Sequence, residues 1–150
     1  MLQSFINRLT SKEEDTTLLN ESDARTAVAA LLVHVAKIDE NYTQTEQHLI
    51  EAILAHRYEL ADADASALRI EGEEAETQSV DNFRFTQVIK SGLEENERMT
   101  VLEAMWSVVL SDEERDDKED NLVRRLVEML GLSPHDSAHA RQRVEAAMNS

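Results

Sequence analysis

This sequence of 150 residues contains no cysteine, one proline and three glycines. The lack of cysteine excludes disulfides, thiolate metal sites and cysteine nucleophiles. The scarcity of proline and glycine favours helices through most of the chain. No apolar run approaches the roughly 20 residues that a helix needs to span a bilayer. The first residues lack a basic leader, so we expect no secretion signal and a cytoplasmic location.

Acidic residues outnumber basic residues by 31 to 15, which gives a formal net charge of −16. Such a charge repels phosphate backbones, so nucleic acid is not an expected partner. It is compatible with cations or basic protein surfaces as partners. A solvated acidic surface without a dedicated partner is the simpler interpretation, and composition leaves both open.

The hydrophobic periodicity predicts an all-α protein, with a single domain of seven to eight helices. Residues 1–21 are expected to form a short amphipathic helix and a linker, and residues 22–150 the helical domain. The apolar face of the first helix would either dock on the core or lie on a membrane surface; it consists of Leu2, Phe5, Ile6 and Leu9. The helices of the domain are expected over residues 23–38, 43–56, 59–76, 81–91, 95–110, 117–130 and 134–148.

The segment over residues 59–76 carries an unusual charge. From Glu59 to Asp81 there are eight acidic residues and one basic residue, Arg69. A helix with so few apolar anchors is expected to be marginal and exposed, and Gly72 is expected to weaken its far end. The sequence therefore predicts a solvated acidic helix here.

Two acidic corners, one in each half of the chain, each lie between two apolar helical stretches. Each has the pattern Asp-Glu, with a further Glu seven positions after the Asp. The first corner consists of Asp39, Glu40 and Glu46, and the second of Asp112, Glu113 and Glu119. Aligning residues 28–54 with residues 101–127 gives six identities, concentrated around the corners. The pattern predicts two similar helical hairpins, with the corners as their bends.

The bends are candidate metal sites. Asp39-Glu40 and Asp112-Glu113 stand where helices end, and the negative end of the helix dipole disfavours a carboxylate there by about 0.3–1 kcal/mol. A bound divalent cation would relieve this repulsion. Carboxylate oxygens suit hard ions such as calcium, magnesium or manganese, and zinc also accepts them.

Two of the bend acids also fit a structural role. Glu46 and Glu119 lie three positions after Thr43 and Asp116, which is the spacing of a helix capping box. In a capping box the acid accepts a hydrogen bond from the first backbone N–H of the helix start. The sequence leaves both roles open for these two residues.

Signatures of catalysis are absent. The sequence has no glycine-rich phosphate loop, no Gly-x-Ser-x-Gly elbow and no His-Glu-x-x-His pair. No catalytic residue is assigned, and a non-enzymatic role is expected.

Three stretches around the bends carry a family resemblance: residues 29–39, Val80–Thr86, and residues 102–132. Together they resemble the TerB-like (tellurite-resistance protein B) family of small helical bacterial proteins over roughly residues 24–148. The resemblance implies an all-helical domain of two pseudo-symmetric hairpins, whose bend acids bind metal. It points to Asp39, Glu46, Asp112 and Glu119. The family usually has glycine after each bend aspartate, where this chain has Glu40 and Glu113.

The resulting expectation is a non-catalytic acidic module that binds or senses a divalent cation and contacts other proteins. The resemblance implies a stress response related to tellurite resistance. Two alternatives stay open: a carboxylate-metal enzyme of unknown reaction, and a structural adaptor at the membrane surface. Expected partners are basic protein surfaces or a membrane-associated protein, and the sequence does not indicate the oligomeric state.

Overall fold

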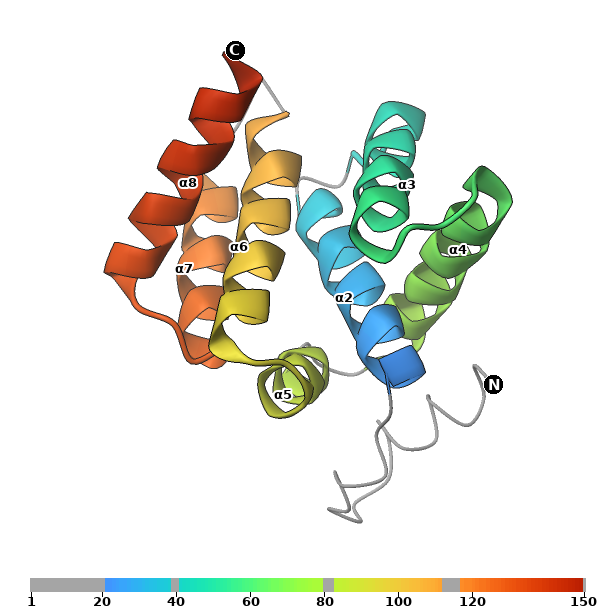
Figure 1. The fold of residues 1–150 in the computed structure, drawn as a ribbon, viewed down its shortest axis with the longest axis horizontal. Coiled ribbons are helices and arrows are strands. Elements are labelled where there is room, and N and C mark those ends of the chain that lie inside the picture. Colours follow the sequence, from blue (N-terminus) through green and yellow to red (C-terminus); the bar gives the residue numbers. More distant parts are fainter. Residues whose placement is uncertain (1–20, 39–40, 80–82, 112–116, 150) are drawn as a thin grey trace.

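The computed structural model describes residues 21–38, 41–79, 83–111 and 117–149, and these residues form helices and short connections only (Figure 1). The predicted all-α fold is confirmed. The described helices are α2 (Glu21–Ala36), α3 (Gln44–Tyr58), α4 (Asp62–Gln78), α5 (Phe83–Gly92), α6 (Glu95–Leu110), α7 (Asp117–Met129) and α8 (Pro134–Met148). The amphipathic helix predicted near the start of the chain lies outside the described residues.

Side-chain caps set the starts of two helices. At α3, the backbone N–H of Glu46 donates to Thr43 Oγ1 at 3.1 Å, and the N–H of Thr43 donates to Glu46 Oε1 at 3.0 Å. At α8, Ser133 and Asp136 form the same reciprocal pair at 3.1 and 2.9 Å. Both ends were predictable because the capping pattern is local in sequence.

The helices form two groups of three, joined mainly through α2 and α6 (Figure 1). The first group is α2, α3 and α4, the second is α6, α7 and α8, and α5 packs against α2 and α7. Corresponding helices of the two groups start at nearly the same distance along the chain. Their first residues are 74, 73 and 72 positions apart: Glu21 and Glu95, Gln44 and Asp117, and Asp62 and Pro134. The predicted pair of hairpins is therefore part of a larger repeat, in which each half has a third helix.

Helix α2 lies at the centre of the core. Every residue from Ala27 to Val33 is fully buried, because α2 contacts both its own group and helices α5, α6 and α7. A helix covered on all sides has no need of an amphipathic stripe, and this one is apolar around its circumference. The surrounding helices fix its position and therefore the start of the first bend.

The prediction of an exposed, marginal helix over residues 59–76 is wrong. Helix α4 packs extensively along α2, and its buried residues recur at helical spacing: Ala65, Leu68, Gly72 and Ala75. Small residues contribute little to a hydrophobic pattern, yet they let two helix backbones come close together. The acidic residues between them masked this face in the sequence.

The predicted weakness at Gly72 is also wrong, because this glycine is where α4 and α2 come into close contact. A Cβ atom added to Gly72 would lie 2.7 Å from the Cβ of Ala29 and 2.9 Å from the backbone nitrogen of Ala30. The second of these neighbours is backbone and cannot rotate away. The absence of a side chain is therefore a packing requirement of the α2–α4 contact.

Replacing Gly72 with alanine is expected to destabilise the protein by about 1–3 kcal/mol, because the added methyl group overpacks the α2–α4 contact. In an unobstructed helix the same change stabilises by about 0.5–1 kcal/mol. Urea unfolding followed by circular dichroism in the far ultraviolet measures the difference. Gly92→Ala is the matched control, since nothing lies within 4 Å of an added Cβ there. Equal, small effects of the two substitutions would show that the close approach is not required.

Candidate functional site

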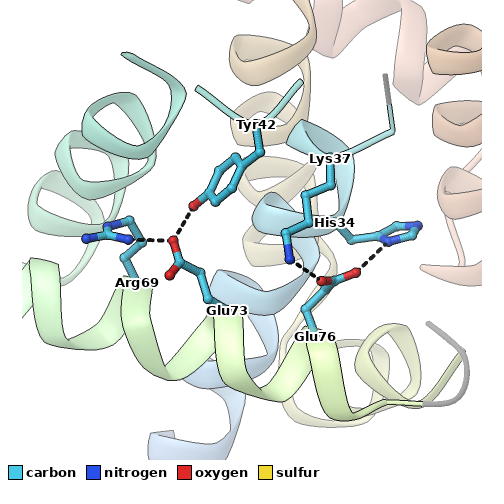
Figure 2. Close-up of polar contacts among 6 residues, drawn as sticks. All are labelled: His34, Lys37, Tyr42, Arg69, Glu73 and Glu76. Carbon is cyan, nitrogen blue, oxygen red and sulfur yellow. Dashed lines mark hydrogen bonds and ion pairs between the residues drawn. The ribbon is translucent and has the colours of Figure 1, made fainter. Parts of the chain in front are cut away.

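Lys37 and Tyr42, on either side of the first bend, belong to a polar network that connects α2, α4 and the segment before α3 (Figure 2). Its members are His34, Lys37, Tyr42, Arg69, Glu73 and Glu76. Helix α4 supplies the acids, and each acid has its own set of partners. Close packing at Gly72 brings the two helices near enough for these contacts.

One part of the network centres on Glu76. Lys37 Nζ donates to Glu76 Oε1 at 2.9 Å, and His34 Nδ1 lies 3.3 Å from Oε2. The Glu76 side chain is only 15 % exposed, so water screens these contacts weakly. The hydrogen bond with His34, together with Lys37, holds the pKa of Glu76 below its ordinary value, although burial acts in the opposite direction.

The other part centres on Glu73. The Tyr42 hydroxyl donates to Glu73 Oε2 at 2.6 Å, and Arg69 Nη1 donates to the same oxygen. Arg69 also reaches α3, where its Nε donates to Glu51 Oε2 at 2.6 Å. Burial raises the pKa of Tyr42, and the neighbouring Glu73 carboxylate raises it further, so the phenol keeps its proton. Arg69 thus joins α3 to α4 while Tyr42 joins the end of the bend to α4.

A weaker contact extends the α4 network along α2. Thr26 Oγ1 donates to Glu71 Oε2 at 3.4 Å. Three glutamates of α4 (Glu71, Glu73 and Glu76) therefore have partners on α2 or beside the first bend. The acidic face of α4 is in part an interhelical surface rather than a purely solvated one.

Comparison with known protein families identifies the family of this chain. The family model described as tellurite resistance protein TerB matches residues 25–142. The chain belongs to the TerB family. The matched region contains both bends and the whole polar network, and the predicted resemblance is confirmed. No curated protein and no solved structure matches the chain.

No helix in the described part of this TerB-family chain is both long and apolar enough to cross a membrane. Among the same residues, no three histidine, aspartate or glutamate side chains lie together in a way that could hold a metal ion. The network acids Glu73 and Glu76 are engaged instead with cationic side chains of the protein.

Four of the six predicted metal ligands lie outside the described residues: Asp39, Glu40, Asp112 and Glu113. Glu119 belongs to α7, and its side chain is likewise outside them. Glu46 is described, and its carboxylate caps α3, which confirms the structural role proposed for it. Metal binding at the bends of this TerB-family protein therefore stays a prediction.

The C-terminal end of α2 is followed in the sequence by the acids of the first bend, but it also carries basic residues. His34 and Lys37 stand in and just after its last turn, where cations interact favourably with the helix dipole. Helix α6, which leads to the second bend, has no basic residue in its last turn. The two bends of this TerB-family chain thus have different settings.

Only part of the polar network is repeated in the second half. In the alignment of the two halves, His34, Lys37 and Tyr42 correspond to Ser107, Leu110 and Arg115. Because α8 starts 72 residues after α4 (Pro134 against Asp62), Arg69, Glu73 and Glu76 correspond to Arg141, Glu145 and Met148. Arg141 and Glu145 form an ion pair one helical turn apart at 3.6 Å, as Arg69 and Glu73 do, but Met148 has no carboxylate to replace Glu76. The contacts of Glu76 with His34 and Lys37 are therefore specific to the first half of a repeated scaffold, and local functions are commonly added to a fold in this way.

Sequence reasoning missed the network although two signals were present. Arg69 and Glu73 stand one helical turn apart on α4, a spacing that forms ion pairs. His34 and Lys37 are likewise about one turn apart near the end of α2. What the sequence lacked was the packing of α4 on α2, because the partners in these contacts are far apart along the chain, as Tyr42 is from Glu73 and Thr26 from Glu71.

Replacing Glu76 with glutamine is expected to lower the free energy of unfolding at neutral pH by about 1–2 kcal/mol, because hydrogen bonds to a charged group are lost. The folded-state pKa of Glu76 lies below its unfolded value. Its stabilising contribution is therefore complete above about pH 5 and is lost as the pH falls through roughly 4 and below. The difference between wild type and Glu76→Gln should shrink over this range in urea titrations.

The control for this experiment is Glu74→Gln, which removes the same charge from a more exposed position on the same helix. It is expected to change stability by less than about 0.5 kcal/mol. A difference between Glu76→Gln and wild type that stays constant from neutral to acidic pH would contradict the charged role of Glu76.

Proposed function

We propose that this protein is a non-catalytic TerB-family module that binds a divalent cation at its first acidic bend and transmits the change to a protein partner through α4. The observation that carries the proposal is the polar network, which ties both flanks of that bend to one helix. Lys37 precedes Asp39, Tyr42 follows Glu40, and the side chains of Lys37 and Tyr42 both end on α4 glutamates.

Anchored flanks favour ion binding for an entropic reason. A cation that binds two neighbouring carboxylates must order the backbone that carries them, and this ordering weakens binding. With Lys37 and Tyr42 already fixed, less of the chain has to be ordered. The short stretch between these anchors includes Asp39 and Glu40, the proposed ligands.

The charge balance of the network also supports cation binding at the bend itself. Arg69 pairs with Glu73 and with Glu51 of α3, and Lys37 pairs with Glu76, so Glu73 and Glu76 already have cationic partners. The carboxylates proposed to attract an added cation are therefore those of Asp39 and Glu40. Calcium, magnesium, manganese and zinc are the candidate ions.

The same network offers a way to transmit binding. A divalent cation at Asp39 would stand close in sequence to the Lys37 ammonium and repel it. Weakening the Lys37–Glu76 ion pair would loosen the contact between α2 and α4. Helix α4 also carries acids outside the network, Asp62, Asp64 and Glu74, that suit a basic protein surface. The proposal includes a cytoplasmic location and a stress response of the kind that the family description names.

Titration of the metal-free protein with calcium, magnesium, manganese and zinc, followed by amide NMR, tests the proposal. For diamagnetic ions, saturable shifts are expected around residues 36–46 and at Glu76. Asp39→Asn should abolish them, while Glu76→Gln should keep the shifts at the bend and lose those along α4. Asp112→Asn shows whether the second bend binds independently.

The matched control is Asp64→Asn, which removes one carboxylate of α4 outside the network and should leave the saturable shifts unchanged. Weak, non-saturating shifts over α4 that Asp39→Asn does not alter would indicate nonspecific charge and contradict the proposal. Metal-dependent hydrolysis of phosphate or peptide substrates would favour the enzyme alternative instead. Flotation with liposomes that depends on residues 1–10 would favour the membrane adaptor.

A further inference from the structure

A groove of about 1050 Å³ opens between the second half of α3, the facing side of α6 and the last turns of α8. None of the residues that line it belongs to the polar network at the first bend. Its apolar lining includes Ile53, Tyr58, Val144 and Met148, and Met148 is 56 % exposed. Small-molecule pockets are roughly 300–1,000 Å³ and mostly enclose their ligand. An open groove of this size suits the face of a helix better.

Three arginines and three glutamates line the groove: Arg25, Arg57 and Arg143, and Glu59, Glu97 and Glu103. Arg57 donates to two uncharged oxygens, Thr100 Oγ1 at 2.5 Å and the Glu97 carbonyl at 3.3 Å. Its Nε is buried and, among the described residues, has no hydrogen-bond partner. The Arg143 side chain is 63 % exposed, and its Nε lies 3.5 Å from Glu103 Oε1. Arg57, whose hydrogen bonds go to uncharged oxygens, therefore offers local positive charge to an acidic occupant.

Tyr58 forms an aromatic surface between two of these cations. The Arg25 guanidinium lies 4.6 Å from the ring centroid, and that of Arg57 lies 5.5 Å from it. Such stacking holds the guanidinium groups beside the apolar lining. Apolar contact and acid recognition are thus offered at the same place.

We propose that residues 1–20 of this chain occupy the groove, with the apolar side chains of a short helix in the lining and an acidic stretch against the arginines. Leu2, Phe5, Ile6 and Leu9 recur at helical spacing, which predicts one apolar face. The acids that follow them are Glu13, Glu14 and Asp15. This occupant is independent of cation binding at the bends.

The connection to α2 makes this docking possible. Helix α2 begins at Glu21, about 6 Å along its axis from Arg25, which lines the groove. Residues 10–20, when extended, span up to about 36 Å. A helix over residues 2–9 is about 12 Å long, and the groove follows α6 for about 15 Å from Glu97 to Ser107.

Tethering and charge favour this occupant over a membrane. An isolated helix of about eight residues is only marginally stable in water. It therefore needs a surface to which binding costs little entropy. A short tether supplies a high effective concentration at the groove. Residues 1–20 hold two basic residues, Arg8 and Lys12, and three acidic ones, Glu13, Glu14 and Asp15, so they lack the basic cluster that anionic lipid headgroups attract. In the proposed arrangement the acidic stretch faces Arg57.

Paramagnetic relaxation in the full chain tests the proposal. Because the sequence has no cysteine, Ser4→Cys accepts a single nitroxide label, and helical spacing puts position 4 opposite the expected apolar face. The expected result is loss of amide signal intensity at groove residues, including Thr100, Ser107 and Ala147. Adding Phe5→Ser and Ile6→Ser should restore these signals, while the spectrum of the remaining domain stays folded.

A charge-matched pair of variants tests the role of the arginines. Arg143→Glu should reduce the signal loss in the groove, whereas Arg124→Glu, an exposed change on α7, which does not line the groove, should leave it unchanged. Equal effects of the two would overturn the electrostatic part of the proposal.

Three outcomes would overturn the proposal as a whole. One is signal loss confined to the first turns of α2. Another is signal loss in isotope-labelled wild type mixed with the spin-labelled chain, which would assign the groove to a second copy. The third is an unaffected groove together with flotation on phosphatidylglycerol vesicles that Phe5→Ser/Ile6→Ser abolishes, which would assign the segment to a lipid surface.

Discussion

The close contact of α4 with α2 at Gly72 is the constraint on which the first half of the molecule depends. Without a side chain at this position, the helix backbones approach closely enough for Glu71, Glu73 and Glu76 to reach partners on or near α2. These contacts are partly buried. If the helices lay farther apart, water would separate the carboxylates from their partners. Backbone packing therefore comes first, and the polar network follows from it.

The second half of the molecule uses the same three-helix arrangement with a different spacing device. Trp106 of α6 occupies the position that corresponds to Val33 of α2 in the alignment of the two halves, and its indole reaches α8. Its Nε1 donates to Ser137 Oγ at 3.1 Å, and Arg141 lies 5.1 Å from the ring centroid. Because α8 starts 72 residues after α4, Gly72 corresponds to Val144, which is also buried. A glycine brings the helices together in one half, and a large aromatic residue fills the interface in the other.

The sequence was sufficient for elements whose signals are local. The capping pair Thr43 and Glu46 marked the start of α3, and α6 was predicted with its observed bounds. Helix α4 was misjudged because its buried face consists of alanine, leucine and glycine between acids, and because its partners lie far away in sequence. For the candidate site, Glu46 was identified with both of its possible roles, and the described structure confirms the capping one. The ligand role of the bend aspartates depends on side-chain positions outside the described residues, so it stays a prediction.

The aromatic residues are divided between the two halves of the molecule in a useful way. Both tyrosines, Tyr42 and Tyr58, belong to the half that contains α2, α3 and α4, whereas the single tryptophan belongs to α6. Tryptophan emission therefore reports on one half, and tyrosine absorbance in the near ultraviolet reports largely on the other. A single sample of unmodified protein can show whether the two repeats unfold together or one after the other.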